Sequence, residues 1–411
     1  MNRQLQRITA TADVHSALDK AAPFLTHLHA ARAGSLIVDC GDFFEGTGYY
    51  RIGKGQIERQ VLTSLYDLLA PGNHGWPHYF APELHVMTVC ANATDNQGTP
   101  LFDRLRIMTI GGLRVAVTAV IGPTAFATIP ADQRSDHRVT DPSQALRAVM
   151  RENHHNAEAW VVLSHSGFES DLELAAACPF ADVIFSGHCH SATTGPVRIG
   201  STLVVKGREL GTGYAVAEPG DVTAWTARTA VFPDTGSSAV PAELADTVGR
   251  IAHIRGMLAT PLGPLRERYR GTQLDRHPLL QEIADRLHTG LGADGVILNE
   301  TTLRTILLGD QLTLGDLLAI EPFDNQLVHA FLPGAPGADL NGMRGHLTEQ
   351  VGPLAMAPNP LPPGIRSVLT TNYLADTYLS GRTHQAGLPL GQAVRSTLTT
   401  PPPDDQQVGA R

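Results

Sequence analysis

The stretch ADVIFSGHCH, residues 181–190, contains an apolar run followed directly by two histidines. Its β-branched residues favour a strand. His188 and His190 are two residues apart, so both side chains lie on one face wherever the chain is extended. Such a pair is as typical of a solvated loop as of a metal site, because a metal ion needs a set of ligands. Other segments must therefore supply the rest of the set.

Six similar apolar runs precede this one, and candidate helices at 16–33, 56–69 and 142–156 separate some of them. The runs are RITATADVH (7–15), SLIVDCGD (35–42), YDLLAPGNH (66–74), VMTVCANA (86–93), LRVAVTAVIG (113–122) and AWVVLSHS (159–166). Short apolar strands alternating with helices predict an α/β layered fold. The later stretch TLVVKGRELGTGYAVAEP (202–219) resembles an antiparallel hairpin that closes this part of the chain.

A length of 411 residues allows two domains, each with its own core. Residues 226–240 are rich in Thr, Ala, Pro, Gly and Ser and precede a helical pattern at 242–258. These features predict a catalytic domain at 1–225, a linker and connecting helix at 226–259 and a second domain at 260–400. The tail at 401–411 is polar and proline-rich, which predicts disorder.

The composition is 42% hydrophobic and 17% charged, with a net charge of −9 and no cluster of basic residues. A nucleic acid polymer or an anionic membrane is therefore not expected as the main partner. The N-terminal segment has no apolar signal region, and no run is long enough for a membrane span. Four cysteines without framework spacing suit reduced thiols, and we expect a cytoplasmic location.

Candidate ligands stand at the ends of five of the apolar runs. In an open α/β sheet, side chains that follow the carboxyl ends of the strands converge at one edge. Glycines beside them (Gly41, Gly72, Gly75 and Gly187) permit the tight turns that this convergence requires. The candidates are Asp13, His15, Asp42, Asn73, His74, His165, His188 and His190.

The ordered motifs DVH, GDFFEG, GNHG, SHSG and GHCH resemble those of the calcineurin-like metallophosphoesterases over roughly the first 225 residues. The resemblance implies a four-layer α/β-β-α sandwich followed by a second, smaller α/β domain. It also implies two divalent metal ions. One ion would be held by Asp13, His15 and His190, and the other by Asn73, His165 and His188. Asp42 would bridge the two ions. His74 would lie beside them and hydrogen-bond a phosphoryl oxygen or the leaving group.

Mixed nitrogen and oxygen ligation suits Mn, Zn, Fe or Co without selecting one of them. Cys40 and Cys189 are less suited as ligands, because each alternates with its neighbouring ligands and so points to the opposite face of an extended chain.

Residues 292–328 and 368–379 are similar to the C-terminal, substrate-binding domain of the 5′-nucleotidase family. The similarity implies that Phe323 and Tyr373 sandwich a base, that Arg304 pairs with phosphate, and that Asn299 belongs to the same pocket. For each aromatic ring alone, burial in the core of the second domain is an equal alternative.

The sequence departs from this family at three places. Glu300, Thr301 and Thr302 replace three glycines, and Leu379 lies where a ribose-binding carboxylate is expected. In GNHGWP, Pro77 replaces an aspartate that orients the preceding histidine, and His78 is the neighbouring candidate for that task.

The resemblance implies a phosphatase that hydrolyses a phosphate monoester of a nucleotide or nucleotide-like metabolite through a metal-activated water. A hydrolase of a nucleotide sugar, a cyclic phosphodiester or a thiosulfate ester has the same metal site. A non-catalytic nucleotide-binding protein is the third alternative, although an unused ligand set gives little reason for the residues to stay metal-compatible.

Overall fold

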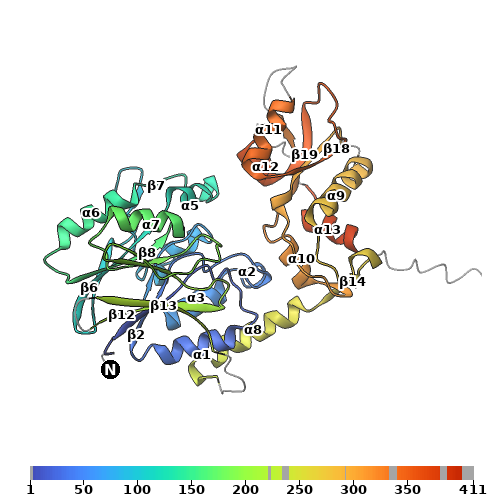
Figure 1. Cartoon of the computed structure of the whole chain (residues 1–411). Coiled ribbons are helices and arrows are strands. Elements are labelled where there is room, and N and C mark those ends of the chain that lie inside the picture. The colour runs from blue at the N-terminus through green and yellow to red at the C-terminus, as the bar shows by residue number, and fades with distance from the viewer. Residues whose placement is uncertain are drawn as a thin grey trace, which may run out of the picture. The chain divides into compact units, whose positions relative to one another are not determined.

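The computed structural model describes residues 3–220, 224–233, 240–291, 293–332, 340–379 and 387–399. Two compact units, Met1–Ile254 and Arg255–Arg411, divide the chain (Figure 1). Each unit has its own hydrophobic core. The boundary lies within α8 (Ala245–Leu258). None of the helices in these ranges is long and apolar enough to cross a membrane. The tail predicted at 401–411 lies outside the described residues.

Unit 1 contains two large sheets. The first has five strands in the order β13 (Trp225–Val231), β12 (Gly213–Pro219), β1 (Arg7–Thr11), β2 (Ser35–Asp39) and β3 (Leu68–Leu69). The second has six strands in the order β10 (Val197–Ile199), β11 (Thr202–Lys206), β9 (Val183–Ser186), β8 (Ala159–His165), β6 (Leu113–Ile121) and β5 (Leu105–Ile110).

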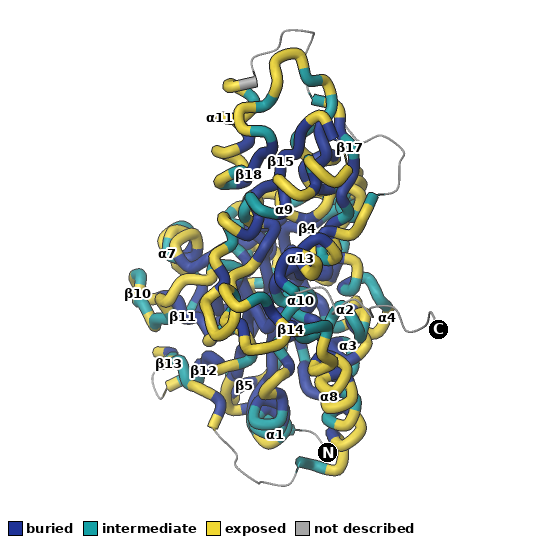
Figure 2. Tube along the Cα trace, turned by 90° about the vertical axis from the view of Figure 1, so that its right-hand side faces the viewer, coloured by how far each residue is buried: buried dark blue, intermediate teal, exposed yellow. Residues whose placement is uncertain are grey.

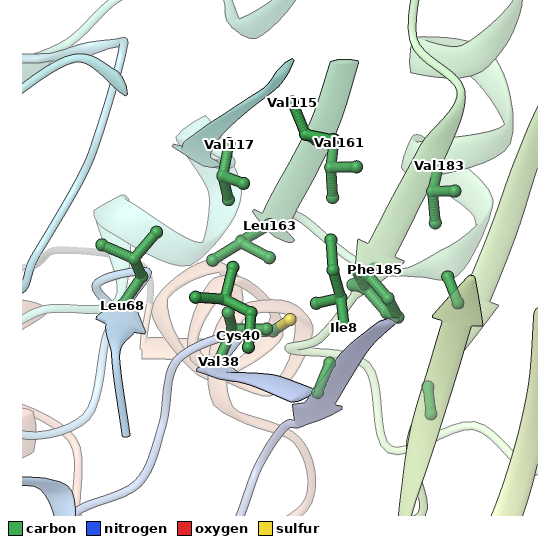
Figure 3. Packing of buried hydrophobic residues seen from close by; sticks show 14 of the residues in the cluster. Ile8, Val38, Cys40, Leu68, Val115, Val117, Val161, Leu163, Val183 and Phe185 are labelled. Carbon is green, nitrogen blue, oxygen red and sulfur yellow. The ribbon is translucent and has the colours of Figure 1, made fainter. Parts of the chain in front are cut away.

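The two sheets face one another across a hydrophobic core. Alternate residues of β8 divide between the two faces of its sheet: Val161 and Leu163 join the core between the sheets, whereas Trp160 and Val162 join the cluster on the outer face. In Figure 3 the side chains that meet between the sheets include Ile8, Val38, Cys40, Leu68, Val115, Val117, Val161, Leu163, Val183 and Phe185.

Helices cover the outer face of each sheet. α1 (Ala21–Ala31) contacts β2 and packs on α3 (Gln56–Leu65), while α6 (Pro142–Asn153) and α7 (Phe168–Ala177) pack on the six-stranded sheet (Figure 1). The side chain of Asp141 accepts a hydrogen bond from the backbone of Gln144 and so caps α6, which begins with proline. The result is a four-layer α/β-β-α sandwich, as the motifs predicted.

Strand register brings the candidate ligand loops to one edge of the sandwich. β1, β2 and β3 are parallel, with Thr11 paired to Asp39 and Asp39 paired to Leu69. In the other sheet β6, β8 and β9 are also parallel, with Ile121 paired to His165 and Ser164 paired to Ser186. The carboxyl ends of these strands therefore align within each sheet.

Two predictions about the end of unit 1 are wrong. Residues 202–219 do not form a hairpin, because β11 pairs with β9 and β10 in one sheet and β12 pairs with β1 and β13 in the other. The first part of the predicted linker, up to Val231, is strand β13. This strand lies at the edge of its sheet, and Trp225 is its one fully buried residue, so the sequence has little apolar signal there.

Unit 2 is built around a four-stranded sheet in the order β17 (Leu327–Phe331), β19 (Ser367–Thr371), β15 (Val296–Asn299) and β18 (Leu354–Ala357). A two-stranded sheet joins β14 (Pro261–Pro264) to β16 (Gln311–Thr313). The helices are α9 (Arg276–Leu291), α10 (Leu314–Ile320), α11 (Leu340–Val351), α12 (Asn372–Thr377) and α13 (Leu390–Leu398). Figure 2 shows β15 buried and most of α11 exposed.

Candidate metal centre

The loops after β1 and β2 lie side by side and are joined by backbone hydrogen bonds. The amide of Asp13 donates to the carbonyl of Gly41 at 3.0 Å, and the amide of His15 donates to that of Asp42 at 2.9 Å. Asp13, His15 and Asp42 have φ values of 53°, 49° and 56°. A left-handed backbone is unfavourable for a non-glycine residue by roughly 1–3 kcal/mol and is concentrated at functional sites.

One group of candidate ligands consists of Asp13, His15 and His190, whose ligand atoms lie within 4.8 Å of one another. The buried Nε2 of His15 has no hydrogen-bond partner. The carboxylate of Asp13 accepts the amide of His188 at 2.9 and 3.2 Å. An unpartnered buried imidazole nitrogen beside a carboxylate matches the donor set of a divalent cation.

A second group consists of Asp42, His165 and His188, again with ligand atoms within 4.8 Å. The Nδ1 of His165 donates to the carbonyl of Cys40 at 2.8 Å, so its Nε2 is the nitrogen directed at the group. That Nε2 lies 3.0 Å from the Oδ1 of Asn73. Asn73, which was also predicted for this group, therefore contacts His165.

Asp42 lies between the two groups. Its Oδ1 is 3.2 Å from the Nε2 of His165, and its Oδ2 is 3.8 Å from the Nε2 of His15. The side chain is buried. One carboxylate oxygen therefore faces a histidine of each group, which is the geometry that a bridging ligand requires.

Glycine is needed at two positions around Asp42 and His165. A Cβ on Gly41, where φ is 95°, would lie 2.5 Å from the Nδ1 of His165. A Cβ on Gly72 would lie 2.2 Å from the backbone nitrogen and the Oδ1 of Asp42. These glycines let the loops after β2 and β3 approach the ligand side chains more closely than any other residue allows.

Burial and mutual charge set the protonation of the site. Burial raises the pKa of Asp13 to about 6 and lowers the pKa of His15 to about 3. Burial, together with the charge of His165, lowers the pKa of His188 to about 4. Two of the histidines are therefore neutral at pH 7, which is the form that binds metal.

Asp42 and His165 form the opposite case. Burial alone would raise the pKa of Asp42 and lower that of His165, but their mutual attraction overcomes it. The pKa of Asp42 falls below its usual range, and the charge and hydrogen bond of Asp42 raise the pKa of His165 to about 9. The lowered pKa of Asp42 favours the ionised carboxylate, which is the form that a bridging ligand takes.

His74 lies beside both groups, and its ligand atom forms a third set with those of His15 and Asp42, again within 4.8 Å of one another. Its backbone amide donates to the Oδ1 of Asp42 at 2.8 Å, and its ring centroid is 5.0 Å from that of His15. Its Nδ1 donates to the Oε2 of Glu45 at 3.0 Å. Burial would lower the pKa of His74, but the hydrogen bond from this ring to Glu45 and the charges of Asp42 and Glu45 raise it.

His78 does not orient His74. The Nε2 of His78 is hydrogen-bonded to the hydroxyl of Tyr50 at 2.9 Å, and its ring stacks on Phe44 with centroids 4.3 Å apart. The residue that holds His74 is Glu45, which the sequence motif contains but to which we assigned no role. A second carboxylate without a predicted role is Glu209, whose Oε2 accepts the Nδ1 of His190 at 2.5 Å.

Glu209 is itself held by a buried cation. The Nζ of Lys206 donates to the Oε1 of Glu209 at 2.7 Å and to the carbonyls of Cys189 and Ser191 at 2.7 and 2.8 Å. Carboxylates that accept from the far nitrogen of a ligand histidine fix its ring and leave the other nitrogen for a metal. No sequence spacing indicates such partners, although an acidic residue close to a ligand motif is a usable signal.

Unit 2 carries the residues of the predicted substrate pocket. Phe323 and Tyr373 are 45% and 47% exposed, so neither ring is buried in the core. The Cζ of Arg304 lies 5.4 Å from the ring centroid of Phe323. The backbone amide of Asn372 donates to the carbonyl of Gln326, and the backbone amide of Gln326 donates to the Oδ1 of Asn372. These two hydrogen bonds link the segments that carry the two rings.

The residues that depart from the 5′-nucleotidase motif make contacts within unit 2. Glu300 pairs with Arg276 and His277 at 3.2 and 3.6 Å, and Thr301 bonds Asn299, whose side chain is buried. Thr302 accepts a hydrogen bond from Asn325. Leu379 packs against a cluster formed by Val328, Ala330 and Ala375 and supplies no carboxylate.

Comparison with known proteins identifies the family. Residues 6–192 match the sequence profile of the calcineurin-like phosphoesterases. Endonuclease YhcR of Bacillus subtilis is 23% identical over 77% of this chain and 29% of its own length. The bovine 5′-nucleotidase is 26% identical over 45% of this chain and 38% of its own length. The chain thus spans well under half the length of these curated relatives.

Solved structures match both units. A 5′-nucleotidase precursor from Thermus thermophilus has a TM-score of 0.69 at 18% identity, with 96% of each chain covered. The sulfate thiohydrolase SoxB of Thermus thermophilus has a TM-score of 0.71 at 19% identity over 93% of this chain and 82% of its own. Residues 6–192 therefore belong to the calcineurin-like phosphoesterases, and the chain as a whole has the two-domain fold seen in solved 5′-nucleotidases.

Proposed function

We propose that this protein is a dinuclear metal-dependent phosphatase that hydrolyses a phosphate monoester of a nucleotide or nucleotide-like metabolite. The observation that carries the proposal is the position of Asp42, which is buried and directed at a histidine on each side. The family match supports an enzyme of the phosphoesterase class. The metal-loaded protein is therefore expected to release inorganic phosphate.

The residues fit a pair of divalent cations. Asp13, His15 and His190 would hold one ion and Asn73, His165 and His188 the other, with Asp42 shared. Bound there, two such ions would lower the pKa of a shared water and offset the charge that develops on the phosphoryl group. The oxygen and nitrogen donors suit Mn, Zn, Fe or Co alike, so selection among them falls to availability and geometry.

His74 would act on the substrate rather than on a metal. Its Nδ1–H donates to Glu45, so the Nε2 edge is free for the substrate, and the ring that is protonated on both nitrogens would donate from Nε2 to a phosphoryl oxygen or to the leaving oxygen. Asp42 accepts its backbone amide and thereby couples the position of this donor to the bridging carboxylate. A fixed donor stabilises charge as it develops and needs little reorganisation during reaction.

Exposed aromatic residues in unit 2 support a ligand with a stackable ring. Phe323 and Tyr373 leave nearly half their surfaces open, and the guanidinium of Arg304 lies over the Phe323 ring. An exposed aromatic ring beside a cation suits a base with an attached phosphate. Because Leu379 offers no acceptor, we expect weak discrimination between ribonucleotides and deoxyribonucleotides, or a preference for an altered sugar.

The test is a panel of esters offered to protein loaded with Mn, Zn, Co or Fe. Nucleoside monophosphates should release phosphate fastest, and removing the metal with a chelator should abolish the reaction. Faster cleavage of nucleotide sugars, cyclic phosphodiesters or thiosulfate esters would contradict phosphomonoesterase activity while keeping the metal site. Tight nucleotide binding with no hydrolysis of any ester would indicate a binding protein instead.

A further inference from the structure

Glu45 occupies a fixed place in the loop after β2. Its backbone is left-handed, with φ of 64°, and Gly46 follows with φ of 99°. Phe43 and Phe44, which precede it, are both fully buried. The carbonyl of Phe43 accepts the amide of Ser16 at 2.9 Å. These anchors hold the Glu45 backbone although its side chain is 32% exposed.

The loop is also fixed on its other side. The hydroxyl of Thr47 donates to the carbonyl of Ser16 at 2.6 Å and accepts the amide of Tyr49, which caps the short helix α2 (Gly48–Gly53). A Cβ on Gly46 would lie 2.9 Å from the Cβ of His15. The segment that carries Glu45 is therefore packed directly against a candidate ligand.

His74 is fixed at two points by this one loop. Asp42 accepts its backbone amide at 2.8 Å, and Glu45 accepts its Nδ1 at 3.0 Å. The ring cannot rotate about its Cβ–Cγ bond without breaking the bond to Glu45. Because the two nitrogens lie on different edges of an imidazole, this bond turns Nε2 away from Glu45.

Pro77, which ends the GNHGWP motif, and His78, which follows the motif, cannot perform this task. Pro77 has no hydrogen-bonding side chain, and His78 is held between Tyr50 and Phe44. A glutamate side chain is one methylene longer than aspartate and spans the space between the loops after β2 and β3. The carboxylate that orients the histidine thus comes from a different loop.

We propose that Glu45 is the positioning residue of His74: its carboxylate accepts the Nδ1–H and holds the Nε2 edge of the ring toward the substrate. The effect on catalysis rests on the proposed phosphatase function. The contact itself does not, so it can be tested on the folded protein without a substrate.

The first measurement compares turnover in Glu45→Ala, His74→Asn and the double variant, all loaded with zinc. Glu45→Ala should lower kcat by roughly 10- to 100-fold, the range for a carboxylate that orients an active-site histidine from outside the metal shell. KM and metal content should not change. The double variant should be no slower than His74→Asn alone, because Glu45 acts through that ring. The control is Glu173→Ala, an exposed glutamate on α7.

Losses that multiply in the double variant, or metal lost from Glu45→Ala, would contradict the positioning role. The second measurement is the ¹⁵N spectrum of the histidine rings in the zinc-loaded protein, with His74 assigned by difference from His74→Asn. Wild-type His74 should carry a proton on Nδ1, with or without a second proton on Nε2, and Glu45→Ala should reduce the protonation of Nδ1. A His74 ring protonated only on Nε2 would exclude the proposal, even in a protein that hydrolyses no ester.

Discussion

Asp42 combines an unfavourable backbone with a shared side chain. Its φ of 56° carries a penalty of roughly 1–3 kcal/mol, and the loop keeps it because Gly41 and Gly72 leave room around it. In return, its two oxygens face His15 and His165. The residues after β1 and β2 are thus arranged for a function that local stability alone does not favour.

His74 is predicted to affect rate and not metal binding. His74→Asn removes the Nε2 donor and keeps a polar side chain, so turnover should fall by about 10²- to 10⁴-fold while metal content stays unchanged. Steady-state kinetics and metal analysis of the same preparation check this. Loss of metal would make His74 a ligand, and an unchanged rate would make it a structural residue of the turn.

At the scale of residues, the sequence indicates which side chains are candidate ligands but not which side chains they hydrogen-bond. All eight candidates of unit 1 could be named from strand ends, because the carboxyl ends of parallel strands share one edge. The contact between Glu45 and His74 could not be predicted, since it depends on a left-handed backbone in one loop and a ring orientation in another. For the same reason His78 was a plausible but wrong candidate for holding His74.

At the scale of elements, buried strands were easier to predict than edge strands. β8 and β9 are buried on both faces, so their sequences are continuous apolar runs. β13 alternates weakly and resembles a linker. The chain passes from one sheet to the other between β11 and β12, and a local pattern cannot separate that crossover from a hairpin.

The turn after β2 should require glycine at position 41 for metal binding and stability. Gly41→Ala places a methyl group 2.5 Å from the Nδ1 of His165 at a φ of 95°, so it should reduce metal binding as well as stability. Gly98→Ala is the matched control, because Gly98 has φ of 84° and nothing within 4 Å of its Cβ. The control should lose only about 1–2 kcal/mol of unfolding free energy from backbone strain.

Urea unfolding and metal titration of both glycine variants give the two quantities. Equal metal affinity in the two variants would mean that the space at Gly41 does not matter to the site.

At the scale of the whole molecule, each unit has its own core and its own predicted task. Metal-type ligands gather in unit 1, and unit 2 carries two exposed rings, Tyr373 and Phe323, of which Phe323 lies beside Arg304. Phe323→Ala and Tyr373→Ala should each weaken binding of a nucleotide by roughly 5- to 150-fold, which corresponds to about 1–3 kcal/mol of stacking.

Phe331→Ala is the control for the stacking prediction, because Phe331 is a 51% exposed ring on β17 outside the predicted pocket. It should leave KM unchanged. Arg304→Ala should raise KM for any phosphate ester, with or without a base. If neither Phe323→Ala nor Tyr373→Ala changes KM for a nucleotide that the enzyme hydrolyses, the rings do not stack on its base.

The most direct measurement is the metal stoichiometry of Asp42→Asn, determined together with its phosphatase activity. The wild-type protein should bind two divalent ions per chain, and the variant should lose metal and hydrolysis together, because an amide no longer offsets repulsion between two dications. Asp132→Asn, at an exposed position in the same unit, should behave as wild type. An Asp42→Asn protein that retains two ions per chain and full turnover would contradict a dinuclear centre bridged by Asp42.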